Sequence, residues 1–323
     1  MISDELFLKV LRSAVKSPSG HNTQPWKFSK TDDGICIGPD FSRALPVADP
    51  YHRELYISLG CAAETAMIAA RFYGYYPAMQ IIEPEAGYTI KIMMQRDDNI
   101  VQPELFSFIN TRQTTRNLYD DRSIPVNDLE TMETMVSEPG VGIRFFAGQN
   151  EIRQLGPFIA EASAMQIGNP EFKNELIRWM RFSEKEAMHK GDGLYTASSG
   201  IPSIGRVLGS IVLKTAVTPG SETKRLLKQL ENSAAVVLFT SPGDNTDSWI
   251  KTGMAFQRFS LTATRLNLSH SFLNPPCQIA EVREKLSSGL GLAGEYPQLL
   301  IRLGYSKKMP YSLRRNTCQV IAQ

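Results

Sequence analysis

The sequence predicts an α+β fold made of two related halves, and three observations lead to this prediction. Strand-like segments follow one another as hairpins, as in residues 28–37, which turn at Asp32-Asp33-Gly34. Long runs of small and apolar residues, such as 55–73, are typical of helices buried between close neighbours. The helix that begins Gly60-Cys61-Ala62 recurs as a divergent copy that begins Gly253-Met254-Ala255.

The composition is that of a soluble globular protein. The chain has 323 residues, of which 42% are hydrophobic and 21% charged, enough for one large domain or two ordinary ones. The formal net charge of +2 gives no reason to expect a nucleic-acid or membrane partner.

Cysteine spacing and the first residues bear on metal binding and location. Cys36, Cys61, Cys277 and Cys318 lie far apart without a CxxC or Cys/His ligand spacing, so we expect free thiols and no metal site. The opening Met-Ile-Ser-Asp-Glu-Leu lacks the features of a signal peptide. No stretch approaches the roughly 18 uninterrupted apolar residues of a membrane span. We therefore expect a cytoplasmic protein.

Helices and strands are expected in mixed order along the chain. A helix at 6–15 leads into the polar segment 17–28, and the hairpin and the long helix follow. The later expected elements are strands at 78–82 and 88–95, helices at 106–111 and 127–136, a strand at 141–146, a mostly helical stretch at 152–189 broken at 168–170, a surface loop at 191–209, a helix at 224–231, a strand at 234–240, a helix at 252–268 and a strand at 298–303.

The segment 17–28 reads Ser-Pro-Ser-Gly-His-Asn-Thr-Gln-Pro-Trp-Lys-Phe and is rich in residues that break regular structure. Pro18 and Pro25 each fix φ, so this loop is expected to hold one shape. A rigid polar loop between apolar elements suits the binding of a flat polar ligand. A plain helix-to-strand connection would use the same residues, and composition alone does not separate the two interpretations.

Several of these residues resemble motifs of the FMN-dependent nitroreductase family. Residues 18–28 are similar to its PSxxNxQPWxF loop, and Arg112-Gln113-Thr114-Thr115-Arg116 to its Arg-x-Ser/Thr-x-Arg phosphate motif. Ser312-Leu313-Arg314-Arg315 resembles the basic residues near the family's C-terminus. The resemblance extends over nearly the whole chain. It implies a nitroreductase-like α+β fold, FMN as cofactor and NAD(P)H as transient reductant.

The order of the motifs differs from that of an ordinary member, in which the phosphate motif precedes the loop. The family forms homodimers in which each FMN site takes one motif from each subunit, so a tandem duplication would bring both motifs into one chain. The arrangement is similar to the Acg-like branch of fused double nitroreductases. It implies halves at 1–105 and 106–323, with a lid-like insertion at about 152–225. The halves would form a pseudo-dimer within a monomer, or a homo-oligomer of such chains.

One composite FMN site per chain follows from this resemblance. The matching segment of the second half, Glu138-Pro139-Gly140-Val141-Gly142, lacks the Asn and the Gln-Pro-Trp, so the second site is expected to be empty.

Arg112 and Arg116 are the candidate phosphate ligands. They are four residues apart, so in a helical turn they lie on one side and can converge on an anion. Thr114 can donate a hydroxyl hydrogen bond, and the resemblance adds Arg314 or Arg315. Without the resemblance, a solvated basic turn is the favoured explanation of these arginines, because exposed arginine is common.

The resemblance also implies the residues around the flavin ring. Asn22, which can both donate and accept, would face the pyrimidine edge, and Asn274-Pro275 would lie near N5. His21 would be a substrate-side residue, although a surface histidine is the plainer reading. No acid or base of the protein is expected to be catalytic, because the cofactor carries the hydride. The complete set expected at the ring is Pro18, Ser19, Gly20, His21, Asn22, Gln24, Asn274 and Pro275.

The expected function is hydride transfer from NAD(P)H through FMN to a nitroaromatic, a quinone or a related small-molecule acceptor. The alternative is an FMN-storing protein whose insertion, with His189, Asp192 and Tyr195, forms a closed lid. For any one of these residues, a place on the solvated or core face of an ordinary helix is the favoured interpretation. Neither a GxSxG elbow nor a GxGxxG or Walker loop occurs, so a hydrolase, a Rossmann site or a P-loop site is not expected.

Overall fold

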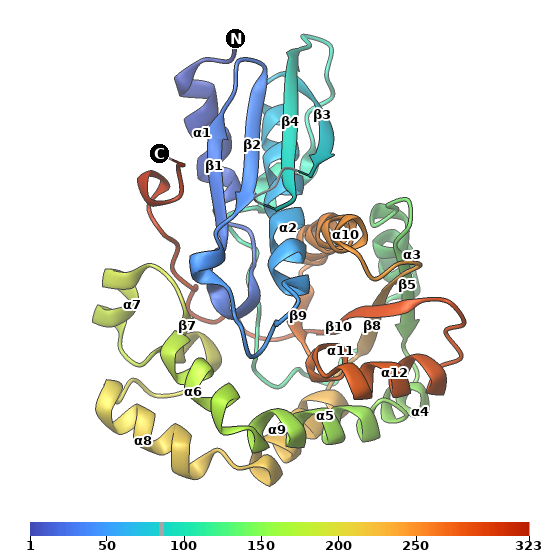
Figure 1. Ribbon diagram of the computed structural model, residues 1–323. Coiled ribbons are helices and arrows are strands. Elements are labelled where there is room, and N and C mark those ends of the chain that lie inside the picture. Colours follow the sequence, from blue (N-terminus) through green and yellow to red (C-terminus); the bar gives the residue numbers. More distant parts are fainter. Residues whose placement is uncertain (84–86, 323) are drawn as a thin grey trace.

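The computed structural model describes residues 1–83 and 87–322 and has the predicted α+β architecture, with two antiparallel sheets and two central helices (Figure 1). Sheet A has the order β1(Trp26–Lys30), β2(Gly34–Pro39), β4(Thr89–Arg96), β3(Tyr75–Ile82). Sheet B has the order β5(Gly142–Phe146), β8(Ala235–Ser241), β10(Tyr296–Gly304), β9(Ser269–Phe272).

Sheet A is covered on one face by α1(Asp4–Ala14) and α2(Arg53–Phe72). Helix α1 is amphipathic and begins at Ser3, whose side chain accepts the Leu6 N–H. The outer strand β3 alternates between exposed and more buried residues, as expected for a sheet with one solvated face.

Sheet B is covered on both faces. Alternate residues of β8 therefore belong to different cores: Val237 and Phe239 pack with α10(Thr246–Arg265), whereas Val236 and Leu238 pack on the other side. A central strand that is buried on both faces reads as a continuous apolar run, as β8 does. The helices of the second face are α4(Gln149–Arg153), α5(Gly156–Gly168), α9(Pro219–Glu231), α11(Pro275–Gln278) and α12(Ala280–Gly289).

The two long helices α2 and α10 cross between the sheets at a pair of glycines (Figure 1). A Cβ on Gly60 would overlap the carbonyl oxygen of Ile250, and a Cβ on Gly253 would overlap that of Ile57. The contact is reciprocal, since each glycine meets the carbonyl three residues before the other. This is the arrangement that a two-fold relation between the helices produces.

The remaining elements differ in part from the sequence prediction. The expected helix at 106–111 is a 3-10 turn, η3(Glu104–Phe108), and the helix near 127 is α3(Val126–Met135). The mostly helical stretch continues through α6(Pro170–Trp179) to α7(Glu184–Lys190), with its break at Asn169, which caps α6. The prediction of a surface loop at 191–209 was wrong. It contains β7(Leu194–Tyr195), which pairs with β6(Met180–Arg181), then η4(Thr196–Ser199) and the start of α8(Arg206–Ala216).

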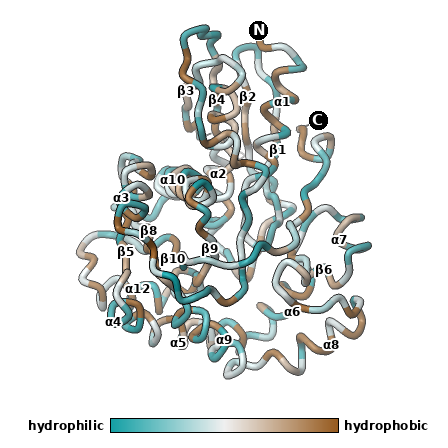
Figure 2. The backbone as a smooth tube through the Cα atoms, turned by 180° about the vertical axis from the view of Figure 1, so that it is seen from behind, coloured by the Kyte–Doolittle hydropathy of each residue, from teal (hydrophilic) through white to brown (hydrophobic). Residues whose placement is uncertain are grey.

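Helix α8 was missed because most of its apolar residues do not face a core, although Leu213 packs with Met180 and Phe182. Val207, Leu208 and Ile211 are more than half exposed, and the helix is largely brown at the edge of Figure 2. Helix α2 would be long and apolar enough to cross a membrane, but 83% of its apolar window is buried in the protein, as in an ordinary core helix.

The C-terminal tail returns to sheet A and lies beside β1 (Figures 1 and 2). Phe28 N–H donates to the Val320 carbonyl and Ala322 N–H donates to the Phe28 carbonyl, both at 2.8 Å. After leaving sheet B the tail passes the loop 17–28. The last short turn is η5(Thr317–Gln319).

Candidate functional site

A cavity of about 290 Å³ lies where the predicted motifs meet. Its walls come from η1(Gly20–Asn22), the first turns of α2, the segment 112–116, α9, the start of α11 and the C-terminal tail. The residues expected at the site that line this cavity are Pro18, Ser19, Gly20, His21, Asn22, Arg112, Thr114, Arg116, Asn274, Pro275 and Arg314.

The loop before β1 has an unusual backbone. His21, Asn22 and Gln24 have positive φ values of 46°, 53° and 54°, a region that asparagine tolerates better than most residues. Each such residue costs about 1–3 kcal/mol, so three within four positions persist only where the surroundings fix them. The loop is fixed at its start by Ser17, which is buried and bonds the Cys61 carbonyl and the Thr65 hydroxyl.

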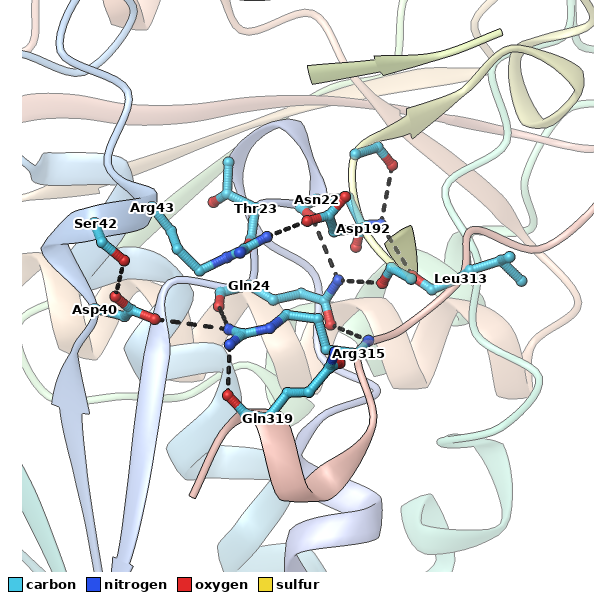
Figure 3. Close-up of polar contacts among 12 residues, drawn as sticks. Asn22, Thr23, Gln24, Asp40, Ser42, Arg43, Asp192, Leu313, Arg315 and Gln319 are labelled. Atoms are coloured by element: carbon cyan, nitrogen blue, oxygen red, sulfur yellow. Dashed lines mark hydrogen bonds and ion pairs between the residues drawn. The ribbon is translucent and has the colours of Figure 1, made fainter. Parts of the chain in front are cut away.

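Asn22 is the centre of the contacts that hold the loop (Figure 3). Its amide N–H groups donate to the carbonyls of Gly193 and Leu313, both at 3.0 Å, and its Oδ1 accepts from Arg314 at 3.0 Å. The Gly193 N–H donates back to the Asn22 carbonyl. The Asn22 side chain thus joins the loop to the segment 191–193 and to the tail, so its amide is not free to meet a flavin edge as the resemblance implied.

Gln24 and Arg315 lie outside the cavity, contrary to expectation. Gln24 is fully buried, donates to the Gly191 carbonyl and accepts the Arg315 N–H at 2.9 Å each. The Arg315 guanidinium turns toward the Gln24 carbonyl and toward Asp40, 3.8 Å away (Figure 3). Both residues support the loop from behind because each already has partners there.

Asp192 fastens the segment 191–193 to the first part of the chain. Its carboxylate pairs with Arg181, at 2.5 Å, and with Arg43 (Figure 3 shows the Arg43 contact). Arg43 also donates to the Thr23 carbonyl. Asp192 therefore anchors the segment 191–193 through its ion pairs and does not line the cavity. His189 and Tyr195 do not line the cavity either, while Leu194 does.

Arg112 and Arg314 bring uncompensated positive charge to one end of the cavity. Arg112 is 6% exposed, and within the described chain its Nε and Nη1 have no hydrogen-bond partner; neither does Nε of Arg314. Both guanidinium groups reach the Lys16 carbonyl, at 3.4 and 3.2 Å. Burial lowers the pKa of Arg112 to about 10, and burial beside Arg112 lowers that of Arg314 to about 9. Buried donors without an acceptor are the mark of an anion site.

Arg116 and Arg225 extend the positive end. Burial and the nearby Arg225 lower the pKa of Arg116 to about 10. Arg225 pairs with Glu222 at 2.5 Å. Among the described residues that line the cavity, this is the one ion pair between an arginine and a carboxylate. Thr114 is held by a bridge to His270, whose carbonyl accepts the Thr115 N–H at 2.9 Å.

The wall of the cavity also contains a carboxyl group. Glu54, in the first turn of α2, accepts from the amides of Asn274, at 2.5 Å, and Gln278, at 2.8 Å. Burial raises the pKa of Glu54, and Asp49 opposes ionisation further, whereas Arg53 favours it. The hydrogen bonds of Arg53 go to the Gln298 and Cys277 carbonyls, so burial prevails.

His21 is a half-buried residue of the cavity wall with a neutral ring. Burial, with Arg116 nearby, lowers the pKa of His21 to about 4. Its ring centroid lies 6.4 Å from that of Phe172. Within the described residues its Nδ1 has no partner.

Sequence reasoning missed several cavity residues. Glu54, Ser58 and Cys61 all lie on the same face of α2, at positions i, i+4 and i+7, and this spacing is the signal that could have revealed them. Arg225 has only the general signal of a basic helix residue. Glu138, in the segment expected to border an empty second site, pairs instead with Arg258.

Comparison with known proteins gives full-length relatives. No family model matches the chain. Two proteins of Mycobacterium tuberculosis strains, each named "Putative NAD(P)H nitroreductase", are 24% identical over 324 aligned residues, covering 97% of this chain and 90% of each relative.

Solved structures give weaker likenesses. A nitroreductase-like protein of Bacillus cereus is 13% identical with a TM-score of 0.41, covering 67% of this chain and 92% of its own. A nitroreductase of Bacteroides fragilis with bound FMN is 17% identical with a TM-score of 0.40, covering 64% and 89%. The similarity to the mycobacterial relatives, by contrast, spans almost the entire sequence, so the chain is similar over its length to proteins named as nitroreductases.

Proposed function

We propose that this protein is an FMN-dependent NAD(P)H oxidoreductase that reduces a nitroaromatic, a quinone or a related small molecule. The observation that carries the proposal is the pair of cavity-lining arginines, Arg112 and Arg314, which have buried nitrogens without a hydrogen-bond partner and no ion pair with any carboxylate of the described residues. A bound phosphate would supply the missing acceptors and the missing charge.

The residues present fit FMN. Arg112, Arg116 and Arg314 would hold its phosphate, with the Thr114 hydroxyl as a further donor. Pro18 to Asn22 and Asn274-Pro275 would border the ring. When bound, FMN would supply the redox chemistry by taking a hydride from NAD(P)H and passing it to the acceptor. The neutral imidazole of His21 adds no charge beside the ring and would shape the space on the substrate side.

We propose that the site is composite and single. Its ring loop comes from the half 1–105 and its phosphate motif from the half 106–323, as in a tandem duplication of the Acg-like kind. The reciprocal contact of Gly60 and Gly253 supports an internal two-fold relation. The ion pair of Glu138 with Arg258 supports a second site that has lost its role. On this view one FMN binds per chain, in a cytoplasmic monomer or a homo-oligomer of such chains.

Storage of FMN is the second candidate function, and the closed segment 191–193 favours it. This segment bonds Asn22 and Gln24 directly and is fastened by Asp192. A segment held this firmly could retain FMN without admitting a substrate.

Anaerobic mixing with NADPH and with NADH separates the two candidates. We expect the purified protein to contain FMN and its absorbance to bleach rapidly with one of the two reductants, then to recover on addition of a quinone or nitrofurazone. Bound flavin that neither reductant bleaches would contradict the reductase and favour storage. A protein that binds no FMN would contradict both.

A further inference from the structure

The Glu54 carboxyl group in the cavity wall has two unlike oxygen atoms. Oε1 of Glu54 accepts both amide hydrogen bonds and lies 3.7 Å from Arg53 Nη2. No hydrogen bond to Oε2 occurs within the described chain. This oxygen lies beside Gly20, at 3.3 Å from where a Cβ on that residue would stand, and Gly20 and Glu54 both line the cavity. One oxygen is thus held by the protein, and the other is left for whatever occupies the cavity.

Reduction of the proposed acceptors needs a proton as well as a hydride. A quinone that receives a hydride still carries an anionic oxygen until that oxygen is protonated, and a positioned acid accelerates the step. The other titratable groups of the cavity wall are poor donors. Glu222 pairs with Arg225 and His21 is neutral, while the Cys61 thiol and the Tyr311 hydroxyl already donate to the Gly253 and Thr111 carbonyls. The arginines do not release protons in proteins.

We propose that Glu54 is the acid that protonates the electron acceptor. This proposal rests on the proposed reductase function. The Oε2–H bond of Glu54 breaks as an O–H bond forms on the acceptor, while bound FMN would supply the hydride taken from NAD(P)H. The carboxylate that remains is met by the Asn274 and Gln278 amides and by Arg53, and solvent returns the proton after the product leaves. Asp49 favours the return of this proton, because its negative charge opposes ionisation of Glu54. The Asp49 carboxylate is held in place by the backbone N–H groups of Glu54 and Leu55, which donate to it.

The Glu54→Gln variant tests the proposal because it keeps the shape and one acceptor oxygen but has no acidic proton. The FMN-loaded protein is reduced with dithionite, so that the test does not depend on NAD(P)H, and is then mixed with menadione or with ferricyanide. Menadione needs a proton and ferricyanide takes electrons alone. We expect the variant to oxidise with menadione at least about tenfold more slowly and to lose the pH dependence of that rate, with ferricyanide unchanged. Glu64→Gln, on the same helix but outside the cavity, serves as the matched control and should leave both rates unchanged.

A readout on the cofactor-free protein complements the rates. The infrared difference between wild type and Glu54→Gln at neutral pH should contain the carbonyl stretch of a protonated carboxylic acid. The proposal is overturned if this band is missing, if menadione reacts equally fast with the variant, or if the menadione and ferricyanide rates fall together. Failure of NAD(P)H to bleach the flavin would contradict the reductase function instead, and the dithionite experiment would still decide the role of Glu54 as an acid.

Discussion

Asn22 shows how one side chain can hold a strained loop. Its amide makes three hydrogen bonds to partners that lie 171 to 292 residues away in sequence. Its backbone is left-handed, with φ at 53°. The loop is therefore shaped by distant parts of the chain as well as by its own prolines.

Replacement of Asn22 by alanine should destabilise the protein by about 3–4 kcal/mol. About 1–2 kcal/mol of this comes from left-handed alanine, and the rest from losing the hydrogen bonds and leaving two carbonyls unpaired. Asn267→Ala is the matched control, because Asn267 is exposed and also left-handed, with φ at 57°. Urea unfolding should show a loss of only about 1–2 kcal/mol for the control. Equal losses in the two variants would show that the Asn22 amide contributes nothing.

Glu64 should make stability depend on pH. Burial raises its pKa to about 7, with Glu138 also raising it, while Arg258 at 3.0 Å lowers it. Because the folded state binds this proton more tightly than the unfolded state does, the free energy of unfolding falls as pH rises from about 4.5 to about 7. The slope from this group is at most about 1.4 kcal/mol per pH unit. Urea unfolding of Glu64→Gln across that window should show a flatter dependence, and an unchanged slope would assign it to other groups.

At the same scale, residue types and spacing predicted some of the site and missed the rest for physical reasons. Arg112 and Arg116 were found through the resemblance to a phosphate motif, whereas the helical turn expected for them was wrong, because the segment 112–116 is not helical and Thr114 bridges to His270. The actual partners of Asn22 and Gln24 were not, because backbone carbonyls of remote segments carry no sequence signal. Arg314 and Arg315 look identical in sequence, and only the fold turns one toward the cavity and the other toward Asp40.

At the scale of elements, the crossing of α2 and α10 is the contact on which both sheets depend. Gly60 and Gly253 allow the helix backbones to approach so closely that a Cβ on either would overlap a carbonyl of the other helix. The repeat of the helix was visible in the sequence, but a repeated glycine does not reveal what it faces. The apolar helix α8 was missed for a related reason, since its exposed residues follow no core-facing pattern.

Alanine at Gly60 or Gly253 should therefore destabilise the protein by about 2–4 kcal/mol, because the two helices must move apart. Gly220→Ala is the control, since Gly220 lies in α9 with nothing within 4 Å of an added Cβ. It should change the free energy of unfolding by no more than about 1 kcal/mol. If thermal or urea unfolding gives the same loss of stability for all three variants, the close helix crossing does not contribute to stability as proposed.

At the scale of the whole molecule, three segments far apart in the sequence meet at the ring loop. The segment 191–193 and the tail both bond residues of the loop, and Asp192 ties the first of them to Arg43. Local sequence patterns predicted most strands and helices, since those depend on periodicity, but not the order of the strands in the sheets. They did not predict this three-way junction, which exists only when the chain is folded.

Replacement of Asp192 by alanine should release the segment, because Arg43 and Arg181 lose their shared carboxylate. A buried cation without its partner is strongly unfavourable, so the segment should open more often. We expect the dissociation rate of FMN to rise at least about tenfold, followed by fluorescence of the released flavin. Glu186→Ala removes the pair with Arg206, farther from the loop, and should leave the rate within about twofold. Equal rates for wild type and Asp192→Ala would show that the segment does not retain FMN.

Titration of the cofactor-free protein with FMN tests the single composite site most directly. Wild type should bind one FMN per chain, and Arg112→Ala with Arg116→Ala should weaken binding by at least about tenfold, since each charge-assisted hydrogen bond contributes about 1.5–3 kcal/mol. Arg96→Ala and Arg122→Ala, which remove two exposed arginines, should leave the affinity unchanged. Two FMN molecules per chain, or equal affinity in the Arg112 and Arg116 variant, would contradict the account.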